Sequence, residues 1–129
     1  MSESKNAGVA RRIIRAVSEF DFDTVHALTC QDIVVEQPFP ALGQPERYEG
    51  AEAFVSGLRL VPTVFSSFEL TIGELFDCPE DEVVIFEQTS RGVFNLNGEI
   101  YENRYVMIFK FRDGKVAVWR EYYNPETMT

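Results

Sequence analysis

The turn dipeptides in the C-terminal half restrict this chain more than any other feature. Asn97-Gly98 and Asp113-Gly114 each stand between long runs of β-branched, aromatic and aliphatic residues. A type I′ turn needs positive φ at both central residues, which these dipeptides tolerate, so they predict two tight β-hairpins. Everything from residue 64 onward is predicted to form an antiparallel sheet, with strands at 65–76, 83–96, 100–111 and 116–124.

The N-terminal half is predicted to be mainly helical. Apolar residues recur near helical spacing from Val9 to Phe20. Asp21 or Asp23 can cap a second short helix. Gly50 begins a third helix that Pro62 ends. A short strand at residues 33–37 and a Pro- and Gly-rich loop at residues 38–45 separate the second helix from the third.

The predicted strands exceed the usual length of about 5–6 residues, and long strands twist and bend at bulges. The helices must bury their apolar stripes against the curved sheet. The predicted fold class is therefore α+β, with three N-terminal helices packed in the concave side of a strongly curved antiparallel sheet. This cone-shaped roll has an open end suited to a ligand cavity. One domain is expected over residues 1–129, with the polar residues 1–6 frayed.

Composition argues against several classes of protein. The 12 Lys and Arg face 21 Asp and Glu, a net charge of −9, which disfavours nucleic acids and anionic membranes. No apolar run has transmembrane length and no leader is evident. Cys30 and Cys78 show no metal spacing and are interpreted as reduced thiols of a cytoplasmic protein. No metal site and no cofactor are predicted, because phosphate-binding, Rossmann and metal motifs are missing.

Strand parity divides the last hairpin into two faces. The aromatic-rich set that includes Tyr101, Asn103 and Tyr105 is assigned inward, and Trp119, Glu121 and Tyr123 follow in the last strand. A carboxylate among aromatic residues is either solvated on an outer face or held in a pocket. The arginines next to it in sequence fall on the other face, together with Val106 and Ile108, which are proposed to form a homodimer interface.

Several segments resemble the SnoaL-like branch of the nuclear transport factor 2 superfamily, which is ketosteroid isomerase-like with a cystatin-like fold. They are similar in particular to phenazine-biosynthesis A/B-type proteins. The segments are residues 35–40, 47–50, 101–105, 112–115 and 120–125. The resemblance implies a cone-shaped fold, a dimer through the sheet, and a cavity for a small, largely apolar molecule. It also implies an acid/base role for Glu121, whose segment matches, although the family's His has no counterpart.

The candidate catalytic residues are Glu121 and Asn103. A carboxyl in an apolar cavity has a raised pKa, which suits proton transfer near neutral pH. The alternative for Glu121 is a surface ion pair. Asn103 would orient Glu121 or a ligand carbonyl, or else satisfy the backbone at a bulge. Glu36, beside the Pro-rich loop, would be a second carboxylate or a substrate acceptor, with a solvated strand residue as the alternative.

Aromatic residues complete the candidate site, as hydroxyl donors or simply as core. The lone His26 is interpreted as a packed or exposed bystander. Two hypotheses result: a cofactor-independent isomerase-, cyclase- or lyase-like enzyme acting by proton transfer on an apolar or aromatic metabolite, or a non-catalytic ligand-binding or dimeric scaffold. The proposed substrate-binding residues are Glu36, Tyr48, Tyr101, Tyr105, Trp119 and Tyr123.

Overall fold

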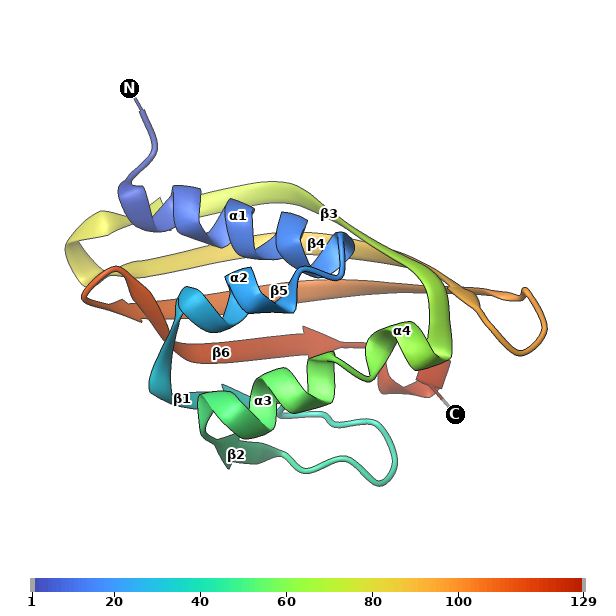
Figure 1. Ribbon diagram of the computed structural model, residues 1–129. Helices are drawn as coiled ribbons and strands as arrows, with labels where there is room; N and C mark the ends of the chain where they lie inside the picture. The colour runs from blue at the N-terminus through green and yellow to red at the C-terminus, as the bar shows by residue number, and fades with distance from the viewer. Residues whose placement is uncertain (1, 129) are drawn as a thin grey trace.

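One curved sheet of six strands, in the order β2-β1-β6-β5-β4-β3, carries all the helices on a single face (Figure 1). The structure is a computed structural model and describes residues 2–128. The strands are β1 (Thr29–Glu36), β2 (Arg47–Glu49), β3 (Phe65–Cys78), β4 (Val83–Phe94), β5 (Ile100–Arg112) and β6 (Lys115–Tyr123). The helices are α1 (Lys5–Ser18), α2 (Phe22–Ala27), α3 (Ala51–Leu58) and the single turn α4 (Val61–Val64), with 3₁₀ turns at Pro79–Asp81 and Pro125–Met128.

The predicted antiparallel meander is confirmed for β3 to β6, and the α+β fold class with it. Asp113 (φ 53°) and Gly114 (φ 78°) both have positive φ, as a type I′ turn requires. At the β4–β5 turn only Gly98 has positive φ (73°), so that turn is wider than expected. Two pairings had no counterpart in the predictions. β2 pairs antiparallel with β1, and β1 runs parallel to β6.

Local capping explains where the first helices begin. The Ser4 hydroxyl accepts a hydrogen bond from the Ala7 N–H, and the backbone N–H and hydroxyl of Ser4 both donate to Asp77. The helix therefore starts inside the segment that was expected to be frayed, since Lys5 is already helical. Asp21 caps α2 by accepting from the Thr24 N–H.

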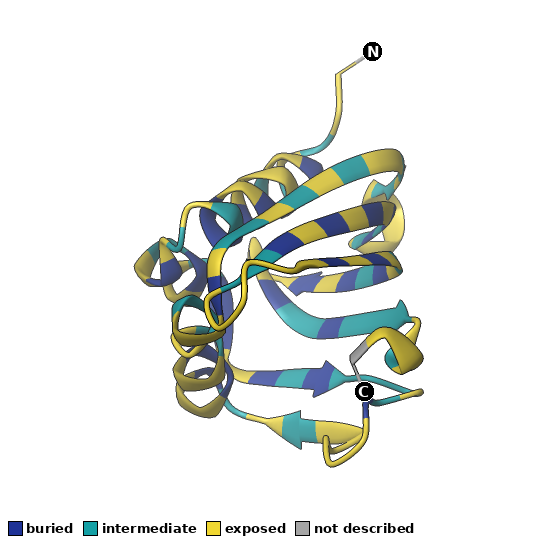
Figure 2. Ribbon diagram, turned by 90° about the vertical axis from the view of Figure 1, so that its right-hand side faces the viewer, coloured by how far each residue is buried: buried dark blue, intermediate teal, exposed yellow. Residues whose placement is uncertain are grey.

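The core lies between the helices and the concave face of the sheet. Phe86 and Phe109 are fully buried, with ring centroids 5.1 Å apart in an edge-on arrangement, and Ile13 of α1 and Val25 of α2 are fully buried as well. Figure 2 shows the resulting alternation of buried and exposed residues along the strands. Apolar burial of this kind contributes about 25 cal/mol per Å², so it is the main contribution that holds α1 and α2 against the sheet.

The parity assigned to β5 is confirmed: its inward set is buried or half-buried, and its outward set is exposed apart from the half-buried Ile108. In β6 the register shifts between Lys110 and Phe111 of the partner strand, which marks a bulge. Because of this bulge, both Val116 and Trp119 are buried although strict alternation would separate them.

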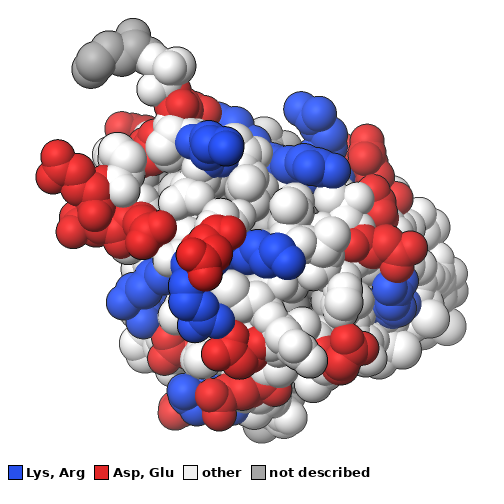
Figure 3. Space-filling view, turned by 60° about the vertical axis from the view of Figure 1, so that its left-hand side comes forward, with Lys and Arg blue, Asp and Glu red and all other residues white. Residues whose placement is uncertain are grey.

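Charged side chains stay on the surface in mixed order. Lys and Arg lie interspersed with Asp and Glu on the face shown in Figure 3, so basic residues form no continuous surface there. Within residues 2–128, no helix combines the length and the apolar character needed to cross a membrane.

Candidate functional site

A pocket of about 370 Å³ opens on the concave side of the sheet, within the size range of small-molecule sites. We call it the concave pocket. Three parts of the chain form it: the sheet, the α3–α4 segment and the loop of residues 37–46 between β1 and β2. Its walls are Gln37, Ala41, Gln44, Gly57, Leu60, Val61, Val64, Phe65, Phe68, Tyr101, Tyr105, Glu121 and Tyr123.

Glu121 is the only acidic residue among these walls. It lies opposite Met107 in the sheet register and shares the concave face with Trp119, whose indole N–H donates to its Oε1 over 2.9 Å. Glu121 is half-buried, and part of its side chain reaches the pocket space. Burial raises the pKa of the Glu121 carboxyl, and the hydrogen bond from Trp119 offsets this only in part.

No basic side chain neutralises Glu121 among the residues that the structure describes. The neighbouring Arg120 points to the opposite face, where its guanidinium pairs with Glu36 at 2.9 Å. Glu36 lies opposite both Arg120 and Arg47 in the sheet register. The structure therefore places Glu36 away from the concave pocket, and the expected second carboxylate is not there, because Val35 takes the inward position.

Three of the four candidate tyrosines line the concave pocket with Glu121, and the hydroxyl of each has a partner within the protein. The Tyr123 hydroxyl donates to Gln37 Oε1 at 2.9 Å and accepts from the Ala41 N–H at 3.0 Å, which ties the 37–46 loop to β6. Tyr105 shares a hydrogen bond of 2.9 Å with Ser90. Tyr101 accepts from the amide of Asn103, as described below.

The fourth, Tyr48 on β2, is not among the walls of the concave pocket, and its hydroxyl has no hydrogen bond within the described part of the chain. Its ring packs against Phe54 at 6.5 Å. Burial, and then the Glu121 charge, raises the pKa of Tyr48 to about 12. Burial also raises the pKa of Tyr105 and Tyr123, and the Glu121 charge adds to both shifts. All three phenols are therefore neutral donors at physiological pH.

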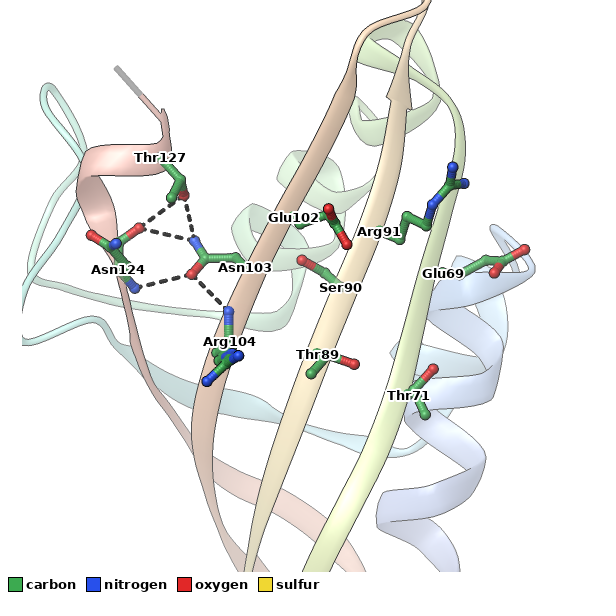
Figure 4. A pocket seen from close by; sticks show the side chains of 10 residues that line it. All are labelled: Glu69, Thr71, Thr89, Ser90, Arg91, Glu102, Asn103, Arg104, Asn124 and Thr127. Atoms are coloured by element: carbon green, nitrogen blue, oxygen red, sulfur yellow. Dashed lines mark hydrogen bonds between the residues drawn. The ribbon is translucent and has the colours of Figure 1, made fainter.

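Asn103 is 6% exposed and serves the local structure. Its amide NH₂ donates toward the Tyr101 hydroxyl (2.7 Å), the Asn124 carbonyl (2.9 Å) and the Thr127 hydroxyl (2.8 Å), and its oxygen accepts from the Asn124 N–H at 3.2 Å. Figure 4 shows the side chain pointing toward Asn124 and Thr127. Asn103 thus fixes the C-terminal turn and reaches the concave pocket only through Tyr101.

A larger cleft of about 660 Å³ lies beside that turn (Figure 4). Its charged residues alternate in sign across the strands, with Glu69 opposite Arg91 and Arg91 opposite Glu102. Such cross-strand pairs compensate one another's charge. These side chains are also exposed, so the cleft lacks the isolated, desolvated group that distinguishes the concave pocket.

The remaining sequence candidates fall outside the pocket. Trp119 is 4% exposed and packs between Phe54 and Phe109, with ring centroids 4.8 and 4.6 Å away, so it supports Glu121 from behind. His26 bridges α2 to α3 through Glu52 at 2.8 Å on the exposed helical side. No group of three or more His, Cys, Asp or Glu within residues 2–128 is arranged to hold a metal ion.

Sequence reasoning indicated that the Pro-rich loop could rim a cavity, but it named none of the loop residues that line the pocket. Gln37, Ala41 and Gln44 line the pocket, yet nothing in their local pattern distinguishes them from other loop residues. The one available signal was the cluster of Pro and Gly at 38–45, which indicated a loop of unusual length. Its attachment to Tyr123 depends on the parallel β1–β6 pairing, which the sequence pattern did not indicate.

Comparison with known proteins agrees with this architecture. The model of the SnoaL-like domain matches residues 10–119. The uncharacterised YesE protein of Bacillus subtilis is 25% identical over 115 residues, 89% of this chain and 78% of that protein. The PhzA/B-like protein PA3332 of Pseudomonas aeruginosa is 26% identical over 92 residues, 71% of this chain and 64% of that protein.

Among solved structures, a Bacillus subtilis protein described as a candidate isomerase superposes with a TM-score of 0.83 at 26% identity, covering 95% of this chain and 88% of that one. The family match spans well over half of the sequence, and the superposition extends it to the whole sheet and its helices. The chain therefore belongs to the SnoaL-like domain family, within the nuclear transport factor 2-like superfamily.

Proposed function

We propose that the protein binds a small apolar or aromatic metabolite in the concave pocket and catalyses proton transfer on it, with Glu121 as the general acid/base. The observation that carries this proposal is a desolvated carboxyl, without a basic partner among the described residues, in a pocket lined largely by apolar and aromatic side chains. A carboxyl with a raised pKa exchanges protons efficiently near neutral pH.

The geometry suggests a division of roles. Trp119 holds one carboxylate oxygen, Oε1, which leaves Oε2 for the ligand. Oε2 would remove a proton from a carbon next to a carbonyl, and the Tyr48 hydroxyl would donate a hydrogen bond to the enolate oxygen that forms. Glu121 would then return the same proton to another carbon, so that the net result is an isomerisation. Cyclisation, dehydration or condensation would begin with the same proton abstraction.

The names of similar proteins lend support at the level of reaction class. One solved relative is described as a candidate isomerase, and one curated relative as PhzA/B-like. An isomerase is the reaction class that the proposed proton transfer would give.

A second function, ligand binding without catalysis, is favoured by one specific observation. The hydroxyls of Tyr101, Tyr105 and Tyr123 all have partners within the protein, so few free donors face a ligand. In that case the pocket would store or carry an apolar molecule, and Glu121 would only contribute a hydrogen bond.

Exchanging Glu121→Gln separates the two functions. Each protein would be incubated in D₂O with a panel of ketones fused to aromatic rings, and deuterium incorporation followed by mass spectrometry. Catalysis predicts exchange by the wild type, and at least a hundredfold slower exchange by the variant with ligand affinity retained. Equal exchange by both proteins, with affinity unchanged, would remove Glu121 from any catalytic role.

We also propose that the protein is a homodimer through the convex face of the sheet. Val106 is 41% exposed and Phe76 48% exposed on this face, and the Phe39 ring, 64% exposed, lies 6.3 Å from Tyr122. Exposed apolar side chains gathered on one sheet face are typical of an interface.

A further inference from the structure

One wall of the concave pocket consists of aromatic rings. Phe65 and Phe68 of β3 and Tyr101 of β5 all line the pocket, and we call these three residues the aromatic wall. The Phe65 ring centroid lies 5.1 Å from that of Phe68 and 5.6 Å from that of Tyr101, and the Phe68 and Tyr101 rings are nearly parallel, at 12°. Strand β4 runs between β3 and β5 and contributes no side chain to the aromatic wall.

Gly92 is the residue of β4 that lies beneath the aromatic wall. It is buried, and in the sheet register it lies opposite Phe68 on one side and Tyr101 on the other. A Cβ atom at this position would lie 2.7 and 2.9 Å from two carbons of the Phe65 ring, and 3.0 Å from a carbon of the Phe68 ring. Carbon atoms pack favourably at about 3.5–4.0 Å. The two rings therefore occupy space that the side chain of any other residue would fill.

A side chain at position 92 would displace these rings into the pocket. The Cβ of an inward-facing strand residue points away from the sheet, so a methyl group there would push the rings toward the concave space by roughly 1 Å. Sideways movement is opposed, because Phe65 is only 6% exposed and packs against Phe94 at 4.8 Å as well as against the rest of the aromatic wall. Gly92 therefore controls how much room the pocket has in front of the aromatic wall.

The aromatic wall and Glu121 line different parts of the same pocket. Tyr101, Tyr105 and Met107 share the inward face of β5 in this order, and Met107 lies opposite Glu121 in the sheet register. A change in the aromatic wall therefore alters the space for a ligand without touching the carboxyl.

We propose that Gly92 is a specificity-determining residue: because it carries no side chain, the aromatic wall lies back against the sheet, and the pocket accepts a flat ligand of two fused aromatic rings with one face against that wall. This assignment deepens the proposed function and rests on it. Stacking on the aromatic wall favours a flat ring system beyond what buried area alone contributes. Gly92 acts through the rings that it positions and does not itself contact the ligand.

The test compares two probes that differ by one fused ring, 2-naphthol and phenol, by NMR titration of the wild type, Gly92→Ala and Gly73→Ala. Burial of the second ring predicts that the wild type prefers 2-naphthol at least about tenfold. G92A is expected to weaken 2-naphthol binding at least about fivefold and to leave phenol binding within about twofold. Gly73 of β3 is the matched control, because a Cβ there would meet only Glu87, at an ordinary 3.7 Å, so G73A should bind both probes as the wild type does.

The ratio of the two affinities separates specificity from a purely structural role. A G92A variant with a lower melting temperature but the wild-type preference for 2-naphthol would show that Gly92 serves only folding, and that result overturns the assignment. So does a wild type that binds neither probe or does not distinguish them. Deuterium exchange by the wild type and E121Q is measured separately. Normal exchange without the preference for 2-naphthol contradicts only the assignment of Gly92, and the preference without exchange contradicts only the catalytic role of Glu121.

A second background guards against a G92A variant that fails to fold. Leucine is smaller than phenylalanine and more flexible, so Phe65→Leu leaves room for a methyl group at position 92. Adding G92A to F65L is therefore expected to change the affinity for 2-naphthol by less than about twofold, because the two substitutions act through the same contact. A loss of about fivefold or more in this background contradicts the proposal, since the effect of Gly92 would then not pass through the Phe65 ring.

Discussion

At the scale of the single residue, the alternation of side chains along β6 determines the surroundings of the Glu121 carboxyl. Arg120, the residue before Glu121, points to the opposite face of the sheet and forms an ion pair with Glu36. Its positive charge therefore does not neutralise the Glu121 carboxyl. What remains is one indole hydrogen bond and an apolar enclosure. The carboxyl keeps its proton to higher pH for that reason, and its ionisation opposes folding.

The pH dependence of stability follows from this. Because the pKa of Glu121 is raised in the folded state, the folded protein binds the proton more tightly than the unfolded chain does. The contribution of Glu121 to the free energy of unfolding is largest below the ordinary pKa of a carboxyl. It is lost as the pH rises from that value through the raised pKa of the folded state. Above it, Glu121→Gln is expected to be more stable than the wild type by at least about 1 kcal/mol.

Urea denaturation at several pH values between 4 and 9 checks this expectation, and the gap between variant and wild type should widen with pH. Glu99→Gln removes an equal charge from an exposed turn and serves as the control. A gap that is constant with pH, or equal for both variants, would mean that Glu121 titrates like a surface carboxyl.

Tyr48 allows a second test at this scale. Its hydroxyl has no hydrogen bond within the described residues, so Tyr48→Phe should leave stability nearly unchanged. If the hydroxyl stabilises a developing oxyanion, deuterium exchange into the ketone probes should slow by about a hundredfold with little change in affinity. Exchange as fast as in the wild type would exclude this role.

At the scale of the element, one phenol, that of Tyr123, joins the loop of residues 37–46 to strand β6. Tyr123 bonds both Gln37 and the backbone of Ala41, and Gln37 also donates from its backbone N–H to the Glu46 carbonyl at 2.7 Å, closing the loop at its base. Since this loop forms one wall of the concave pocket, its order and the shape of the pocket are linked.

Tyr123→Phe is accordingly expected to loosen the loop. Losing two hydrogen bonds should cost about 1–3 kcal/mol and speed amide hydrogen exchange at Ala41 and its neighbours. Hydrogen exchange read by mass spectrometry measures this directly. The matched control is Tyr122→Phe, on the opposite face, whose hydroxyl has no bond in residues 2–128. Similar exchange in both variants would show that the loop is held by other contacts.

The elements also show what the sequence could and could not predict. Turn dipeptides and the alternation of buried and exposed residues were enough to predict strands β3 to β6. Hairpins join segments that are close in sequence, and each of these strands has one buried face. Strand β2 escaped prediction because Arg47–Glu49 is short and mostly exposed. The parallel β1–β6 pairing joins distant segments, and it decides that Val35 and not Glu36 faces inward. The alternation of side chains along the strands predicted the cluster of tyrosines on the inner face. The hydrogen-bond partners of their hydroxyls could be identified only from the three-dimensional structure.

At the scale of the whole molecule, the two faces of the sheet differ in what they carry. The concave face carries the core and the pocket, and the convex face carries a stripe of apolar residues crossed by the Glu36–Arg120 pair. A dimer formed there would leave both pockets open, since they face away from the interface.

Val106→Arg is the direct test of this arrangement. Val106 lies near the middle of the convex face, between Glu87 and Tyr122 in the sheet register. Stable dimers bury roughly 800 Å² per partner, so paired arginines at such a centre should repel and desolvate poorly. Sedimentation velocity at micromolar concentration should show a dimer for the wild type and a monomer for the variant. Lys110→Ala, which removes a charge from the same face, should remain dimeric. A wild type that sediments as a monomer would contradict the homodimer. The concave pocket would then act within a single chain.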